Sequence, residues 1–140
     1  MNPSINYLVR KYEKEGDFSY TQITKNQIKE AQNSLSLNLP KSYIEFLRIY
    51  GQGGIGGCEI FGVGKTGNLV FVNETKKYWK YGLPANFIVI ENCDEWIHCL
   101  DGKSGDVVAW YHGDIEKLFP DFDSFLLSRF CDVLENIPYR

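Results

Sequence analysis

The sequence predicts an α+β domain: N-terminal helices, a mostly antiparallel mixed sheet of about five to six strands, and a closing C-terminal helix. Two observations lead to this fold class. Apolar side chains recur at helical spacing before Gly51 and again from Phe122 onward. Between these two regions, residues 87–111 consist of short β-branched and aromatic runs that are separated by turn residues, as strands of a meander are.

Three helices are expected in the first part of the chain. The first covers Ile5–Tyr12, and Thr24 with Gln27 forms a capping box at the start of the second. The third begins at Pro40, which suits the first turn of a helix because its missing N–H costs nothing there. The apolar face of this third helix, at positions i, i+3, i+4 and i+7, consists of Tyr43, Phe46, Leu47 and Tyr50.

A glycine cluster follows this third helix and matches the spacing of a dinucleotide-binding turn, Gly51-x-Gly53-x-x-Gly56. That turn needs a strand before the glycines and a helix after them, and here the order is reversed. Gly51 instead stands where a left-handed C-terminal cap belongs. No cofactor is therefore expected at these glycines.

A second phosphate-binding resemblance, Gly64-Lys65-Thr66, is also rejected. A P-loop needs a glycine five positions before Gly64, where this chain has Glu59, and it needs a helix directly after the loop. We expect a hairpin turn here, with Gly67 at positive φ, between strands at 58–63 and 68–72.

The remaining elements follow from the same signals. A helix is expected over residues 73–81 with Asn73 as its cap, and strands are expected at 87–90, 96–100 and 107–111. A closing helix follows, with Asp121 as a cap. Its apolar residues at helical spacing are Phe122, Phe125, Leu126, Phe130, Val133 and Leu134.

Length and composition indicate one domain, residues 1–140. A chain of 140 residues with 44% hydrophobic and 15% aromatic residues is large enough to bury a core. The sequence has neither a secretory signal pattern nor a run of about 18 apolar residues, so we expect a cytoplasmic protein without a membrane span. The four cysteines lack a C-x-x-C pair, and reduced structural thiols are expected.

The net charge of −3 conceals an asymmetry along the chain. Residues 1–90 contain eleven Lys and Arg against seven Asp and Glu, a net charge of +4, whereas residues 91–140 contain four against eleven, a net charge of −7. An acidic half argues against direct nucleic-acid binding, which depends on cationic side chains at phosphates. It suits a basic protein partner, and equally a solvated surface that keeps the protein soluble.

Several motifs, taken in order, resemble the Smi/Knr-like branch of the SUKH superfamily from about residue 20 to about residue 130. They are Leu39-Pro40-x-x-Tyr43-x-x-Phe46-Leu47, Gly51 with its following glycines, Ile88-Val89-Ile90, Cys99-Leu100-Asp101, Val108-x-Trp110-x-His112 and Phe122-x-x-Phe125-Leu126. Family members often carry asparagine beside the glycines, where this chain has Gln52. The resemblance implies structural roles for Pro40, Tyr43, Phe46, Leu47, Gly51, Trp110, His112 and Phe125. We expect His112 to be a structural hydrogen-bonding residue rather than a proton shuttle.

The resemblance implies a non-catalytic binding domain. In bacteria such domains are mostly immunity proteins that neutralise a cognate polymorphic toxin, often a nuclease; in fungi a related domain occurs in a cell-wall synthesis regulator. We expect a protein toxin with a basic surface as the partner, and a regulatory or scaffold role is the alternative. The partner-binding residues expected around an aromatic anchor are Glu91, Asp94, Glu95, Trp96, Asp101 and Asp106.

No catalytic, metal or cofactor site is expected. His98 and Cys99 are neighbours on one strand and point to opposite faces, so at most two of Cys93, His98 and Cys99 can converge, whereas zinc usually takes three or four protein ligands. A nucleophile pair of Cys99 or Cys131 with His98 or His112 stays open, because the sequence cannot place these residues together. Aspartates beside glycines are typical turn formers: Asp101, Asp106 and Asp114.

Overall fold

The computed structural model describes residues 1–135 and confirms the α+β class. Its six strands form two antiparallel sheets, one in the order β1-β2 and one in the order β3-β4-β5-β6. The helices are α1 (Pro3–Lys11), the 3-10 turn η1 (Glu13–Glu15), α2 (Lys25–Leu35), α3 (Lys41–Ile49), α4 (Val70–Trp79) and α5 (Phe122–Glu135). The strands are β1 (Gly16–Phe18), β2 (Gly53–Ile55), β3 (Phe87–Asn92), β4 (Ile97–Asp101), β5 (Val107–Tyr111) and β6 (Asp114–Phe119).

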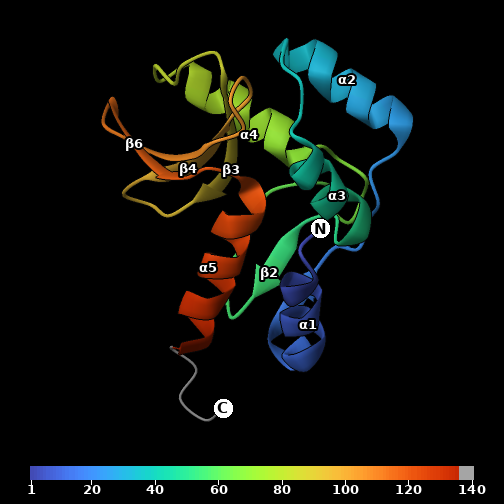
Figure 1. The fold of residues 1–140 in the computed structure, drawn as a ribbon. Helices are drawn as coiled ribbons and strands as arrows, with labels where there is room; N and C mark the ends of the chain where they lie inside the picture. Colours follow the sequence, from blue (N-terminus) through green and yellow to red (C-terminus); the bar gives the residue numbers. More distant parts are fainter. Residues whose placement is uncertain (136–140) are drawn as a thin grey trace.

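Helices α4 and α5 cover opposite faces of the four-stranded sheet. Tyr78 of α4 packs edge-on against Trp110 of β5, with 6.3 Å between the ring centroids, whereas Phe125 of α5 packs against His98 of β4 at 5.0 Å. Helix α5 also contacts β2 and α1, so it joins the large sheet to the small one, as Figure 1 shows. Within the described residues, no helix has both the length and the apolar character that a membrane crossing requires.

The aromatic face predicted for α3 forms the centre of the core. Tyr43, Phe46 and Leu47 are fully buried, and Phe46 packs against Phe122 of α5 with 5.5 Å between ring centroids. The Tyr43 hydroxyl donates a hydrogen bond of 2.6 Å to the carbonyl oxygen of Phe61. Each large apolar side chain buried in this way contributes about 1.5–3 kcal/mol, so α3 is held mainly by packing.

The glycines after α3 allow backbone segments to approach one another. Gly51 adopts φ +76° directly after the helix, as a C-terminal cap requires. At Gly53 a β-carbon would collide with the carbonyl oxygen of Asp17, because β2 pairs closely with β1 there. The glycines therefore build a compact strand pair after a helix, and the structure confirms that the dinucleotide-binding order is reversed.

Two predicted strands between the glycines and β3 are wrong, and the helix predicted after them is present but begins earlier than expected. Residues 58–63 form only isolated bridges at Ile60 and Val63 rather than a strand. The expected strand over 68–72 is absent, because α4 begins at Val70 and its N-cap is Leu69 rather than Asn73. Tertiary packing overrides the β-branched composition here: the α4 residues buried at helical spacing are Phe71, Val72 and Thr75. A helix thus does follow the Gly64–Gly67 turn, although the missing glycine at Glu59 still excludes a P-loop.

The other local signals are confirmed. Thr24 and Gln27 make both reciprocal bonds of the capping box, Gly67 has φ +82° in its turn, and Asp121 accepts a 2.7 Å bond from the N–H of Ser124 at the start of α5. Strand β6 is an additional element that the sequence pattern did not indicate. A two-residue turn at His112 and Gly113 joins it to β5, and both residues have positive φ, as a type I′ hairpin turn requires.

Candidate functional site

A β-bulge in β3 places Glu91 on the α5 face of the large sheet. Val89 pairs with Cys99, but Glu91 pairs with His98, so Ile90 is the extra residue. Without this bulge, strand alternation would put Glu91 on the face that α4 covers. The backbone groups beside the bulge are satisfied from outside the sheet: the N–H of Val89 donates to the Thr75 hydroxyl, and the N–H of Phe61 donates to the carbonyl of Ile90.

Glu91 is a buried carboxylate with four donors around it. Its side chain is 4% exposed, and Arg129 of α5 binds it with two bonds, Nε to Oε1 at 2.9 Å and Nη2 to Oε2 at 2.5 Å. The Nδ1 of His98 lies 2.8 Å from Oε1, and the thiol of Cys58 donates to Oε2 at 3.4 Å. Burial raises the pKa of Glu91, but the bonds from His98 and Arg129 outweigh burial and lower that pKa to about 2.

His98 links this carboxylate to an aromatic side chain at the surface. The indole Nε1–H of Trp96 donates to Nε2 of His98 at 3.1 Å. Because Nε2 accepts this bond, the proton of the neutral imidazole lies on Nδ1 and points at Glu91. Arg129, Glu91, His98 and Trp96 thus form one chain of hydrogen bonds that fixes the orientation of the half-exposed indole.

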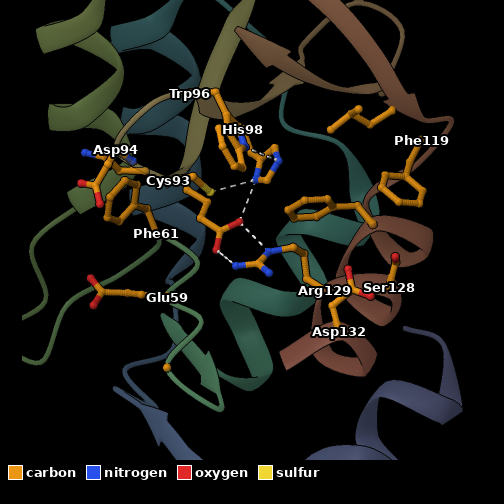
Figure 2. A pocket seen from close by; sticks show the side chains of 15 residues that line it. Glu59, Phe61, Cys93, Asp94, Trp96, His98, Phe119, Ser128, Arg129 and Asp132 are labelled. Atoms are coloured by element: carbon orange, nitrogen blue, oxygen red, sulfur yellow. Dashed lines mark hydrogen bonds and ion pairs between the residues drawn. The ribbon is translucent and has the colours of Figure 1, made fainter. Parts of the chain in front are cut away.

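This chain lies beside a cavity of about 780 Å³ between the β3–β4 hairpin, α5 and the 57–61 segment. Figure 2 shows Glu59 and Asp94 on one side of the buried network and Ser128 and Asp132 on the other. Aromatic rings form much of the wall, and the lining carries four carboxylate residues against one arginine. The aromatic lining residues are Phe61, Trp96, Phe119 and Phe125, and the carboxylate residues are Glu59, Glu91, Asp94 and Asp132.

The β3–β4 turn holds three of the predicted partner-binding residues, and two of them, Asp94 and Trp96, line the cavity. Asp94 has φ +67°, and its N–H donates to Oδ1 of Asn92 at 2.8 Å. The N–H of Cys93 donates to the carbonyl of Trp96 and closes the turn. Asp94, Glu95 and Trp96 are exposed there, Trp96 with 39% of its surface.

The six predicted partner-binding residues do not lie in one patch. Glu91 is buried and its charge is already compensated by Arg129, so the expectation that it contributes a surface charge is wrong. Asp101 and Asp106 lie at the other end of β4, in the turn to β5. Asp101 accepts bonds from Asn86 and from the N–H of Lys103, and Asp106 pairs with Lys117 at 3.5 Å.

The residues singled out by the family resemblance occupy distinct places. Pro40 is the N-cap of α3, and Phe125 is buried against His98. Trp110 is half-buried under α4, whereas its neighbour Tyr111 is 46% exposed, so one aromatic of β5 faces inward and the other outward. His112 is exposed in the β5–β6 turn with φ +45°, which places it in a turn-forming role rather than in the expected hydrogen-bonding one.

The side chains that could bind a metal ion at this site are already engaged by the guanidinium of Arg129 and by one another. Within the described residues, Glu91, Cys93 and His98 are the one group of three whose ligand atoms converge, within 4.8 Å. Both carboxylate oxygens are bound by Arg129, and Nδ1 of His98 carries a proton, so a metal would have to displace both. Burial first, and then the charge of Glu91, raises the pKa of the Cys93 thiol to about 12, which keeps the thiolate unavailable at neutral pH.

The nucleophile pairs left open by the sequence are not assembled. Cys99 is fully buried and pairs across the sheet with Val89 and Val108, whereas the neighbouring His98 faces α5. Cys131 is exposed on α5, and His112 lies in the β5–β6 turn. Cys93 does lie 3.5 Å from Nδ1 of His98, but that nitrogen donates to Glu91 and cannot take the thiol proton.

Arg129 is the site residue that sequence reasoning missed. It lies 38 positions from Glu91 in the sequence. The sequence of α5 alone does not distinguish this arginine from one that faces solvent. One signal was present: an arginine within a helix whose apolar face is otherwise buried has to find an anion if it packs inward. The bulge that brings Glu91 to the same face has no signature in the apolar run before it.

The structure and the sequence are each similar to those of known proteins. A crystal structure of a protein from Pseudomonas syringae pv. tomato is similar, with a TM-score of 0.64 and 18% sequence identity over 81% of this chain and 89% of that chain. At this identity the likeness establishes the fold alone. The SUKH_5 family, described as "SMI1-KNR4 cell-wall", matches residues 1–131. The chain therefore belongs to this SMI1-KNR4 family of the SUKH superfamily, a family of binding domains that includes immunity proteins.

Proposed function

We propose that this protein is a cytoplasmic immunity protein that binds a cognate bacterial toxin domain and blocks it by occlusion, without catalysis. The observation that carries the proposal is the cavity beside the β3–β4 turn, where exposed acidic residues surround an oriented tryptophan. Interfaces place such aromatic anchors at their centres, and complementary charges steer the encounter. Family membership supports the same class of function.

The proposed toxin carries a basic surface, as nuclease domains that bind phosphates do. The acidic C-terminal half, with a net charge of −7 over residues 91–140, would compete for that surface. Occlusion needs no chemistry from the immunity protein, which agrees with the protonated state of the Cys93 thiol beside Glu91. It needs a rigid, complementary surface, and the hydrogen-bonded chain from Arg129 to Trp96 would provide one.

A regulatory or scaffold domain that binds an endogenous protein is the second candidate. The description of the matched family, which refers to the cell wall, favours it. Both candidates are protein-binding functions, and the same cavity would serve either. They differ in the identity of the partner and in the consequence of losing it.

The decisive experiment is co-expression with the product of the neighbouring gene. We expect that product to stop growth alone, and this protein to restore growth and to co-purify with it. A neighbouring product that is harmless, or that is toxic but neither rescued nor bound, would contradict the immunity function. Co-purification with a harmless housekeeping protein would support the regulatory alternative.

A further inference from the structure

We infer that the cavity between the β3–β4 turn and α5 takes a lysine or arginine side chain that the partner inserts. This inference rests on the proposed function, because it assumes a protein partner. It adds which kind of side chain that partner places in the cavity. It depends on four features of the described residues: the balance of charge in the cavity, the place of its rim carboxylates outside the converging ligand group, its aromatic wall and the fixed orientation of Trp96.

The charge of the cavity favours a cation. Arg129 is the positive residue of the lining, and two of its N–H groups are bound to the buried carboxylate of Glu91. Its charge is therefore compensated inside the site. The carboxylates of Glu59 and Asp94 are exposed at the rim and lie on the same side in Figure 2, so the field at the mouth is negative.

The two rim carboxylates lie outside the group of converging ligand atoms, which favours an extended organic cation over a metal ion there. The convergent ligand group in the described residues consists of Glu91, Cys93 and His98, and it includes neither Glu59 nor Asp94. A metal ion needs several ligand atoms that converge on it, and neither rim carboxylate belongs to such a group of three or more in the described residues. A guanidinium or ammonium group on a flexible stem can contact separated carboxylates one at a time.

The walls suit the apolar stem of such a side chain. Phe61, Trp96 and Phe119 line the cavity together with Glu59 and Asp94, so the methylene stem of a side chain lying along this wall would pack against the rings while its charged end contacts a carboxylate. Trp96 adds an electrostatic attraction, because a cation over an indole face is stabilised by the ring quadrupole. The bond from the indole N–H to His98 holds that face in place before the partner arrives.

The size of the cavity agrees with this occupant. A volume of about 780 Å³ is larger than one side chain, so residues flanking the inserted lysine or arginine would also enter. Trp96 also borders a second hollow, which His98, Ala109, Tyr111, Glu116 and Leu118 line as well. The flanking residues of the partner would follow this hollow, whose wall joins apolar side chains to the carboxylate of Glu116.

The test uses the full-length protein and two matched small probes, N-acetyl-arginine amide and N-acetyl-citrulline amide, which differ mainly in charge. Their binding is followed by NMR through the indole N–H of Trp96 and the backbone amides of residues 91–96. We expect saturable shifts with the arginine probe, with a dissociation constant on the order of millimolar, and no saturation with citrulline. Equal responses to the two probes would overturn the inference.

Variants identify the cavity as the location of binding. Asp94→Asn and Glu59→Gln should each weaken binding of the arginine probe about two- to fivefold, whereas Glu30→Gln, an equal charge change on the exposed surface of α2, should leave it unchanged. Equal weakening by all three would indicate a general charge effect and would also overturn the inference. Because no toxin is needed, arginine binding without growth rescue would contradict the immunity function alone, and rescue without arginine binding would contradict the cavity assignment alone.

Discussion

Two regions of the molecule, one around α3 and one around α5, are stabilised by different interactions. Around α3, the rings of Tyr43 and Phe46 and the glycines at the β1–β2 contact pack backbone and apolar surface closely, and the region is closed to solvent. Around α5, a buried carboxylate, a guanidinium and an imidazole are joined by hydrogen bonds and border an open cavity. The first region determines whether the fold forms. The second presents polar groups and an aromatic side chain to a partner.

Replacing Phe46 by alanine tests the closed region and should have the largest effect. Phe46 is fully buried, so the lost contacts and the cavity left behind should lower the free energy of unfolding by about 3–5 kcal/mol. Urea denaturation measures this change. Ile49 on the same helix is 41% exposed, and Ile49→Ala should cost far less. Similar costs for the two variants would contradict the assignment of α3 as the packed centre.

Arg129→Ala tests the polar region. It leaves the carboxylate of Glu91 buried without its cation, and we expect a loss of about 3 kcal/mol in the free energy of unfolding. Replacing both members by leucine, Glu91→Leu with Arg129→Leu, should recover most of that loss, because no uncompensated charge remains. A double variant that is less stable than Arg129→Ala would show that the pair itself stabilises the fold.

The pH dependence of stability separates the two regions further. The pKa of Glu91 is about 2 in the folded protein against a reference of 4.5, so its contribution is fully present above pH 4.5 and is lost as the pH falls toward 2. At pH 3 this single group should cost roughly 2 kcal/mol relative to pH 7. The quantity to measure is the slope of the free energy of unfolding against pH, in the wild type and in Glu91→Gln. This slope should be shallower in the variant at acidic pH. Identical slopes would contradict the low pKa.

Tyr43→Phe removes only the hydroxyl that donates to the carbonyl of Phe61. The ring stays in place, so a loss of about 1 kcal/mol is expected, at the level of one hydrogen bond whose acceptor is left buried. Amide hydrogen exchange should show faster opening of residues 58–63, which this bond ties to α3. Unchanged exchange in that segment would mean that the bond does not anchor it.

The helices of the closed region were largely predictable from the sequence, because their signals are local, whereas the β1–β2 pair was not predicted. The spacing of the α3 aromatics, the capping box at Thr24 and the glycine after α3 each act within one turn of helix. The start of α4 was not predictable in this way, because Val70–Val72 favours a strand by composition and is made helical by its packing on β3. Strand β6 was missed because its exposed edge carries no apolar alternation.

The polar region was only partly predictable. Trp96 and Asp94 were expected at the site, and the hairpin places both at the cavity mouth. Glu91 was expected among the partner-binding residues, and only the bulge at Ile90 determines that it turns inward toward α5. The contact with Arg129 joins residues 38 positions apart, so it depends on how α5 docks on the sheet, which no local pattern encodes.

The most direct test of separate roles for the two regions is the affinity of a charge-reversed variant for the co-purified partner. Asp94→Lys combined with Glu95→Lys changes two exposed residues of the β3–β4 turn and should leave the free energy of unfolding within about 0.5 kcal/mol of the wild type. We predict that its affinity for the partner falls at least about tenfold and that the dependence of affinity on salt becomes weaker. Wild-type affinity with wild-type salt dependence would contradict the placement of partner binding at this turn.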